Sequence, residues 1–225
     1  MTSRARLIDT QVPVEPRGVV LILHGGASRR ENMTVSPTQL SVVRMIPIAN
    51  RIARMGRGRL AVFRLLNSVR GWDSHHTPVQ DAQWALRQIR YRLGQDLPTS
   101  LVGHSLGGRA ALLAADEETV VSAVALAPWV YPTDVAEGRP GRRILIVHGS
   151  ADRIAAPKNS IAVTRSLARA GSVSYIRIEG GKHAMLRQHN KFDGYAARFV
   201  GATLLGLPAD GAVGRALAGE EWIDG

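Results

Sequence analysis

The residues with the clearest chemical potential are Ser105, Asp152 and His183, which occur in that order along the chain of 225 residues. Ser105 stands at the centre of Gly103-His104-Ser105-Leu106-Gly107-Gly108, a G-x-S-x-G pattern. An apolar run directly precedes this pattern, and a helical pattern directly follows it. This context predicts a nucleophile elbow, a tight strand-to-helix turn that exposes a serine hydroxyl and needs small neighbours.

A serine hydroxyl is a weak nucleophile and needs a base that takes its proton. His183 follows the apolar run 173–178, and Asp152 follows the run 144–147. If both runs are parallel strands, the two side chains reach the same carboxyl edge of the sheet as Ser105. We therefore expect His183 to serve as general base and then as general acid. Asp152 is expected to fix the tautomer of His183 and to stabilise its charged form.

A second glycine-rich segment, His24-Gly25-Gly26-Ala27, ends the apolar run 19–23. Glycines let backbone N–H groups approach a substrate closely. The segment predicts an oxyanion hole formed by the backbone N–H groups of Leu106 and Gly26, with Ala27 as the second choice. Such donors stabilise the negative charge that develops when serine attacks a carbonyl carbon.

Short apolar runs alternate with helical patterns along the chain, which predicts an α/β fold. Most runs are continuous rather than alternating, as is typical of strands buried on both faces of a mainly parallel sheet. The predicted strands are 19–23, 60–66, 99–102, 121–126, 144–147 and 173–178, with an earlier strand or hairpin within 5–14.

Two signatures with a hydroxyl residue, a proline and a glutamine predict capping boxes at helix starts. They are Thr77-Pro78-Val79-Gln80 and Ser36-Pro37-Thr38-Gln39. Pro47 lies inside the helical pattern that follows Ser36, so that helix either kinks or begins later. The segment after Pro208 is rich in glycine and alanine, and it either docks as a short helix or frays.

Composition limits the class of protein. Hydrophobic residues make up 45% of the chain and charged residues 21%, which is typical of globular domains. The absence of cysteine excludes disulfides, thiolate metal sites and cysteine nucleophiles. Met1 to Gly18 lacks the apolar run of a secretory signal, and no stretch approaches the length of a membrane span. A cytoplasmic protein is therefore expected.

The net charge of +11 raises nucleic-acid binding as another function class. The arginines are scattered, without a dense block or interleaved aromatic residues, so a solvated basic surface is favoured and no nucleic-acid partner is expected. His75 and His76 lack a carboxylate at ligand spacing, and we expect no metal. Structural roles are expected for His24 and His104.

The motifs HGG, GHSLGG, HGSAD and GGKH occur in this order, and with them the chain resembles the α/β-hydrolase superfamily from about Gly18 to Leu205. It is most similar to the small lidless esterase and dienelactone-hydrolase-like branch. The resemblance implies about eight mostly parallel strands with helices on both faces of the sheet, and no cofactor. Residues 1–225 are expected to form a single α/β-hydrolase domain, with a core over about 18–205 and a possible tail over 208–225.

Many relatives insert a lid where this chain has only Ala127 to Arg143 between two predicted strands. An open site without a lid domain is therefore expected. Trp129 and Tyr131 in that connection, together with Ala27, are candidates to line a substrate pocket. Packing within the loop is an equal alternative for the two aromatic residues, and Trp72 is a similar case.

Two other acidic residues compete with Asp152 for the role of triad acid. Asp134 follows the strand 121–126, where some relatives hold their acid, and Glu179 precedes His183. Asp152 is favoured because HGSAD matches the usual motif. Glu179 is expected at the strand end, too early in the chain order.

These residues and the resemblance predict a serine hydrolase, carboxylesterase-like, that cleaves a carboxylic ester or related acyl bond of a small molecule through an acyl-enzyme. Amide or peptide hydrolysis, carbon–carbon bond cleavage and perhydrolysis are alternatives, as is a non-catalytic α/β-hydrolase-fold binding protein. A further hypothesis is that Arg29, Arg30 or Arg109, near the oxyanion loop and the elbow, holds an acidic substrate.

Overall fold

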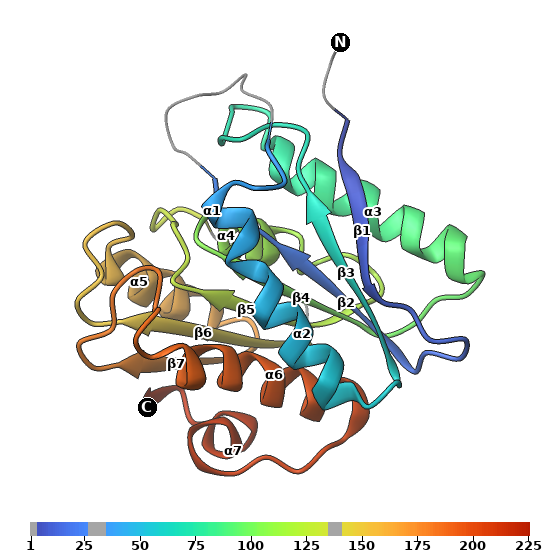
Figure 1. Ribbon diagram of the computed structural model, residues 1–225. Helices are drawn as coiled ribbons and strands as arrows, with labels where there is room; N and C mark the ends of the chain where they lie inside the picture. The colour runs from blue at the N-terminus through green and yellow to red at the C-terminus, as the bar shows by residue number, and fades with distance from the viewer. Residues whose placement is uncertain (1–3, 27–34, 135–140) are drawn as a thin grey trace.

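The computed structural model describes residues 4–26, 35–134 and 141–225, and their strands form one sheet (Figure 1). The strand order is β1-β3-β2-β4-β5-β6-β7-β8. β1 is antiparallel to β3, and the other neighbouring strands are parallel. The predicted α/β fold with a mostly parallel, eight-stranded sheet is confirmed.

The predicted strands are all present, and the strand expected within 5–14 is a single strand. The strands are β1 (Arg6–Gln11), β2 (Gly18–Leu23), β3 (Leu60–Leu66), β4 (Thr99–His104), β5 (Val120–Leu126), β6 (Arg143–Gly149), β7 (Ser172–Ile178) and β8 (Trp222–Asp224). The helices are α1 (Leu40–Val43), α2 (Met45–Gly56), α3 (Thr77–Leu93), α4 (Leu106–Leu113), α5 (Pro157–Leu167), α6 (His189–Leu205) and α7 (Gly211–Leu217).

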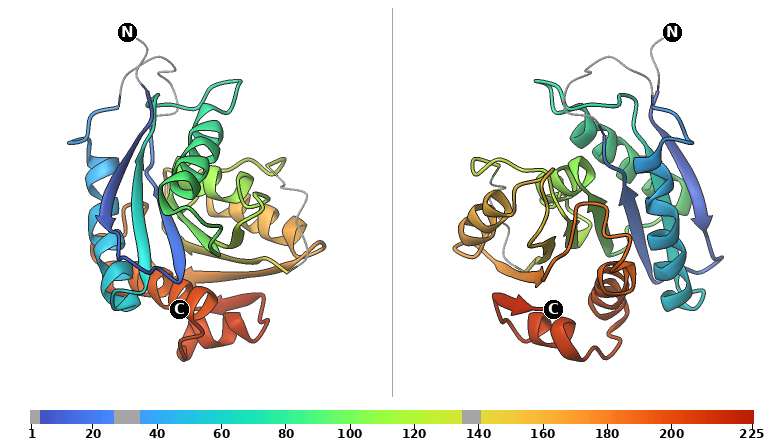
Figure 2. Two further views of the ribbon diagram at one scale, coloured as in Figure 1. Left: turned by 90° about the vertical axis from the view of Figure 1, so that its right-hand side faces the viewer. Right: turned by 60° about the vertical axis from the view of Figure 1, so that its left-hand side comes forward.

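The interior strand β2 is continuously apolar because both of its faces are buried. Its alternate residues Val20 and Ile22 belong to the core that α2 and α6 cover. Val19 and Leu21 belong to the core on the opposite face, which α3 and α4 cover. Helices lie on both faces of the sheet (Figure 2). A strand that is buried on both sides favours apolar side chains at every position, and every residue of β2 is buried.

Both predicted capping boxes are wrong in detail. α3 begins at Thr77 itself, and the Thr77 N–H donates to Asp73 Oδ1 at 2.8 Å, while the Gln80 amide bonds to the carbonyl of His75 at 2.9 Å. The first long helix, α2, begins only at Met45, after a break at Arg44. Pro47 therefore lies in the first turn, where its missing N–H breaks no helical hydrogen bond.

The C-terminal segment packs as part of the fold rather than fraying. β8 pairs with β7 through the register Tyr175↔Trp222 and Ile176↔Ile223, and it forms one edge of the sheet. Val213 on α7 and Ile223 on β8 are both buried in the core. A few apolar side chains within a glycine- and alanine-rich segment are therefore enough to dock it.

The carboxyl ends of the parallel strands meet at one edge of the sheet. Residues 127–142 connect β5 to β6, and a connection of this length is too short for a lid domain, as predicted. None of the helices in the described ranges has both the length and the apolar composition needed to cross a bilayer.

Candidate active site

Ser105 occupies the turn between β4 and α4. Its backbone has φ of +57° and ψ of −119°, a region that residues with a Cβ rarely adopt. Three backbone hydrogen bonds hold this conformation. The Ser105 N–H donates to Leu126 O at 3.0 Å, and Ser105 O accepts the N–H groups of Arg109 and Trp129, each at 3.1 Å. This is the strand–turn–helix geometry that the G-x-S-x-G pattern predicts.

The glycines of the motif allow the backbones around the elbow to touch. A Cβ on Gly103 would lie 2.0 Å from Gly107 O, and a Cβ on Gly107 would lie 2.2 Å from Leu23 O. Neither distance is possible for a real side chain. β4, the elbow and the end of β2 can therefore come together only because these positions lack a side chain.

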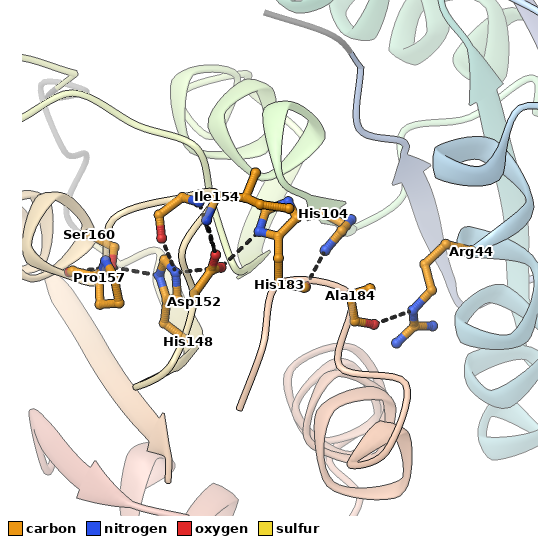
Figure 3. Close-up of polar contacts among 10 residues, drawn as sticks. Arg44, His104, His148, Asp152, Ile154, Pro157, Ser160, His183 and Ala184 are labelled. Carbon is orange, nitrogen blue, oxygen red and sulfur yellow. Dashed lines mark hydrogen bonds and ion pairs between the residues drawn. The ribbon is translucent and has the colours of Figure 1, made fainter. Parts of the chain in front are cut away.

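Asp152 and His183 are joined directly. His183 Nδ1 lies 2.7 Å from Asp152 Oδ2, across the loops that follow β6 and β7 (Figure 3). The Asp152 side chain is fully buried, whereas 13% of the His183 side chain is exposed. The two groups are thus placed as the chain order Ser–Asp–His requires, with the imidazole open to the site.

Asp152 is held as a carboxylate. Burial raises its pKa, but the hydrogen bonds from His148 and His183 outweigh burial and bring the pKa below the usual range. The N–H groups of Ile154 and Ala155 donate to the other carboxylate oxygen at 2.8 Å and 3.0 Å. The negative charge opposite His183 is therefore stable across the neutral pH range.

The loop that carries His183 lies against the elbow. His104 precedes Ser105, and its Nε2 is 3.0 Å from the carbonyl oxygen of His183. The two rings are 4.9 Å apart between centroids. Within the described ranges no hydrogen bond joins Ser105 Oγ to the His183 ring. Such bonds are often long without substrate and shorten in the reacting complex.

The two residues predicted to supply the oxyanion donors lie near each other. Leu106 is the first residue of α4, and a Cβ built on Gly26 would lie 3.2 Å from Leu106 Cδ1. Neither amide makes a backbone hydrogen bond in the described part of the chain. The N–H groups are therefore candidates to bind a substrate oxygen. Ala27, the second choice and a predicted pocket residue, lies outside the described residues.

The predicted pocket residues Trp129 and Tyr131 pack edge to face, with centroids 5.1 Å apart. The guanidinium of Arg109 lies 4.0 Å from the Trp72 ring centroid and 5.0 Å from that of Tyr131. Because the Trp129 N–H binds Ser105 O, this aromatic cluster is fixed next to the elbow. The contacts confirm that the two aromatic residues pack together, and their role in lining a substrate pocket stays a prediction.

The alternative acids are engaged elsewhere. Asp134 Oδ1 lies 2.6 Å from Arg109, in an ion pair with both side chains buried. Glu179 is exposed and pairs with Arg177 at 3.1 Å. Because Asp134 already compensates the charge of Arg109, the structure gives no support to an acidic-substrate role for that arginine. Arg29 and Arg30 lie outside the described residues.

His24 has the structural surroundings that were expected. The Asn67 N–H donates to its Nε2 at 3.1 Å, so the proton is on Nδ1, which lies 2.6 Å from Gly25 O. Burial lowers the pKa of His24 and keeps it neutral. His75 and His76 join no cluster of three potential metal ligands among the residues that the structure describes.

Two residues at the site were missed by sequence reasoning. His148 at the end of β6 is fully buried, and its Nε2 lies 3.1 Å from Asp152 Oδ2. Arg44 donates through Nε to Ala184 O at 3.0 Å, next to His183 in the chain (Figure 3). His148 is the first residue of the HGSAD motif, so its position in the motif could have pointed to it. Arg44 precedes His183 by more than half the chain, and no local pattern marked it.

Comparisons with known proteins agree with this fold. The family model described as "PETase: PET hydrolase-like" matches residues 88–202. No curated protein matches the chain. A structure described as a putative α/β hydrolase from Agrobacterium tumefaciens is 17% identical, with a TM-score of 0.66, over 92% of this chain and 94% of that chain.

Two further structures have the same fold. A lidless α/β serine hydrolase from Xanthomonas campestris is 16% identical, with a TM-score of 0.63, over 92% of this chain and 99% of that chain. Esterase 2 of Thermogutta terrifontis, phosphoramylated by tabun, is 17% identical, with a TM-score of 0.66, over 87% and 88% of the two chains. With its elbow, its eight-stranded sheet and a family match over more than half of its length, the chain belongs to the PET hydrolase-like family of α/β-hydrolase-fold proteins.

Proposed function

We propose that the protein is a serine hydrolase that cleaves carboxylic esters through an acyl-enzyme on Ser105. The observation that carries this proposal is the 2.7 Å contact between His183 and the buried Asp152, in a loop that is bonded to the residue before Ser105. A buried carboxylate on Nδ1 leaves Nε2 of the same ring as the basic nitrogen. The similar structures reported above, which are named as a serine hydrolase and an esterase, support the same reaction class.

Each group has a defined role in the proposed reaction. Ser105 Oγ attacks the ester carbonyl carbon while His183 Nε2 takes the hydroxyl proton. The N–H groups of Leu106 and Gly26 bind the oxygen that becomes negative. His183 then gives the proton to the departing alcohol as the ester C–O bond breaks. A water molecule attacks the acyl-enzyme with His183 again as base; the bond between the acyl group and Ser105 Oγ breaks, the carboxylic acid leaves, and His183 returns the proton to Ser105 Oγ. Asp152 stabilises the imidazolium that forms in each half of the reaction.

The test is hydrolysis of p-nitrophenyl esters of increasing acyl length by the wild type, Ser105→Ala and Ser172→Ala. Ser172 is exposed at the start of β7, the opposite end of that strand from the site, so it is a matched control. We expect Ser105→Ala to lower kcat by about 10⁴- to 10⁶-fold, and Ser172→Ala to leave it unchanged. A fluorophosphonate probe should add its mass to the wild type and not to Ser105→Ala.

Each way in which ester hydrolysis or probe labelling could differ from this expectation has a different meaning. A folded wild type that hydrolyses none of these esters and does not react with the probe would contradict the proposal. Labelling of Ser105 without ester turnover would favour amide or carbon–carbon bond chemistry at the same site. Equal activity in Ser105→Ala would place the reaction elsewhere in the molecule.

A polyester is the second candidate substrate. The family is named for PET, and exposed apolar side chains stand on segments that follow the carboxyl ends of the strands. Leu40 is 86%, Ile154 68% and Leu186 70% exposed. An open site with an apolar border suits a substrate that is itself an apolar surface.

PET film and a soluble aromatic ester separate the two substrates. If the border binds the film, Ile154→Ser and Leu186→Ser lower release of aromatic acid from the film and leave kcat/KM on the soluble ester near the wild-type value. A chain that cleaves soluble esters and releases nothing from film is an esterase for small substrates. The exposed Val14, on the loop between β1 and β2, is a matched control for loss of surface apolar area.

A further inference from the structure

His148 lies in the core and contacts the same oxygen of Asp152 as His183 does. It follows Val147 near the end of β6, and none of its side chain is exposed. Nε2 is 3.1 Å from Asp152 Oδ2 and 3.1 Å from Ala155 O, while Nδ1 is 2.7 Å from Ser160 Oγ (Figure 3). The proposed mechanism gives this buried, titratable ring no role.

The partners of His148 determine where one of its protons must be. Asp152 Oδ2 and Ala155 O only accept hydrogen bonds, because Asp152 is a carboxylate and the other oxygen is a backbone carbonyl. A lone pair on Nε2 would face two acceptors, so Nε2 carries a proton whether the ring is neutral or charged. Nδ1 faces the hydroxyl of Ser160, which either donates or accepts. His148 is therefore a hydrogen-bond donor to Asp152 in both of its charge states.

With this donor, the Asp152 carboxylate is fully bonded. Oδ1 accepts the N–H groups of Ile154 and Ala155, and Oδ2 accepts His148 and His183. A carboxylate has about four acceptor positions, and four donors occupy them here. Because the side chains of both Asp152 and His148 are fully buried, no water can replace a lost donor without entering the core.

We propose that His148 is a positioning residue for Asp152: its Nε2–H fixes the rotation of the carboxylate, so that Oδ2 remains in line with Nδ1 of His183. The inference rests on the proposed function, since it assigns a role within the same site. The supporting network continues through Ser160, whose Oγ also lies 2.8 Å from Pro157 O in the first turn of α5. The helix thereby orients His148, and His148 orients Asp152.

Other charged or titratable groups also face this pair. His104 on β4 contacts His183, and Arg44, between α1 and α2, influences His104. Tyr175 on β7 lies near Ser160 and Asp152. A change in the pH dependence of kcat/KM can therefore be assigned to His148 only when the compared variants retain His104, Arg44 and Tyr175.

The decisive pair of variants is His148→Leu and His148→Gln. Leucine removes the donor, whereas the glutamine amide nitrogen can take the position of Nε2. We expect His148→Leu to lower kcat by about 10- to 100-fold with KM nearly unchanged, as for other hydrogen bonds that orient a functional group from behind. With one donor fewer on Asp152, the acidic limb of kcat/KM moves up by about half a pH unit, since the His183 imidazolium is better stabilised. His148→Gln should recover most of the rate.

A spectroscopic readout keeps the test independent of turnover. The downfield proton resonance of His183 Nδ1, identified by its loss in His183→Gln, should shift or broaden in His148→Leu and remain in His148→Gln. His75→Gln, which removes an exposed histidine, should leave both readouts as in the wild type. Wild-type kcat, pH profile and resonance in a folded His148→Leu protein would overturn the proposal.

Two further outcomes are also decisive. Equal losses in the leucine and glutamine variants, with the same fall in melting temperature and an unmoved acidic limb, would show a packing role and reject positioning. If the wild type has no Ser105-dependent hydrolysis, the proposed function fails. The resonance comparison still decides whether His148 holds the Asp152–His183 pair, so the two failures are distinguishable.

Discussion

His104 Nε2 lies 3.0 Å from the carbonyl oxygen of His183, so the residue before Ser105 bonds to the backbone of the proposed base. A carbonyl only accepts, and Nε2 therefore carries the proton. Burial, followed by the nearby charge of His183, lowers the pKa of His104 to about 3. His104 is thus a neutral donor at any pH at which the enzyme is expected to work, and it adds no charge beside the base.

The first prediction concerns this contact. His104→Phe keeps a flat ring in the same place but leaves the His183 carbonyl without its donor, at a cost of about 1–3 kcal/mol. Part of that cost is expected as looser placement of His183, with kcat lowered by about 10-fold. His104→Gln supplies a donor and should retain more activity. Steady-state kinetics on one ester should give kcat values that decrease from the wild type to His104→Gln to His104→Phe. A kcat of His104→Phe equal to that of the wild type would contradict the prediction.

The second prediction is an acid-dependent loss of stability caused by His104. In the unfolded chain a histidine has a pKa of about 6.5, whereas the folded-state pKa is about 3. Between these values the unfolded state binds a proton that the folded state does not, so the free energy of unfolding falls as pH falls. This residue alone is expected to remove about 2 kcal/mol between pH 7 and pH 5.

Urea denaturation of the wild type and His104→Leu at the two pH values measures this effect. The difference between pH 7 and pH 5 should be smaller in the variant by about 2 kcal/mol. Some dependence must remain, because burial also lowers the pKa of His24. The same pH dependence in both proteins would show that His104 is protonated in the folded state. Below about pH 4 the lowered pKa of Asp152 adds a further loss, since the unfolded carboxylate takes up a proton first.

The third prediction concerns the buried ion pair beside the His183 loop. Arg44 lies 2.6 Å from Asp193 Oδ1, and its Nε also donates to Ala184 O. Removal of one partner leaves a buried charge uncompensated, so Arg44→Met and Asp193→Leu should each destabilise the fold by about 3 kcal/mol or more. The double variant should lose much less than the sum. Urea denaturation of the wild type, the two single variants and the double variant gives the coupling free energy between Arg44 and Asp193. Additive losses of stability would contradict the pairing.

The two halves of this pair also differ in their predicted effect on activity. Arg44→Met removes the donor to Ala184 O, while Asp193→Leu leaves that donor in place. At a temperature where both variants are folded, kcat should therefore fall more in Arg44→Met. Equal kcat values would limit Arg44 to a role in stability.

The elements and the chemical residues were predictable from the sequence for a common reason. Strands that are buried on both faces are mostly apolar, and the polar residues that follow parallel strands gather at the carboxyl edge of the sheet. Asp152 and His183 each follow a strand of this kind, so their contact could be inferred from position alone. The C-terminal segment could not be assigned, because β8 is short and depends on β7 for its pairing.

The features that the sequence predicted wrongly or did not reveal all depend on tertiary contacts, which a local sequence pattern does not specify. Thr77 matched a capping signature, but Asp73, folded back from the preceding loop, binds the Thr77 N–H instead. Arg44 reaches Ala184 only because α2 and α6 lie side by side on one face of the sheet (Figure 1). His148 was visible in HGSAD as a letter, while its direction toward Asp152 depends on Ser160 and the start of α5.

The last prediction tests whether the elbow requires a missing side chain. Gly107 has ordinary helical backbone angles, so an alanine there meets no dihedral penalty, but its Cβ would lie 2.2 Å from Leu23 O and 2.6 Å from His24 O. The contact is with backbone, which cannot move without separating β2 from α4. Gly107→Ala should therefore destabilise the fold by about 3 kcal/mol or more and abolish Ser105 labelling by a fluorophosphonate.

Gly58 provides the matched comparison. Its φ is +75° and a Cβ there would have no neighbour within 4 Å, so Gly58→Ala meets backbone strain without a clash. This variant should lose only about 1 kcal/mol and keep full labelling. Equal loss of stability in both variants would mean that close approach of β2 does not limit the residue at position 107. A folded Gly107→Ala protein with full labelling would show that the elbow tolerates a side chain there, and that the contact between β2 and α4 is not needed for an exposed nucleophile.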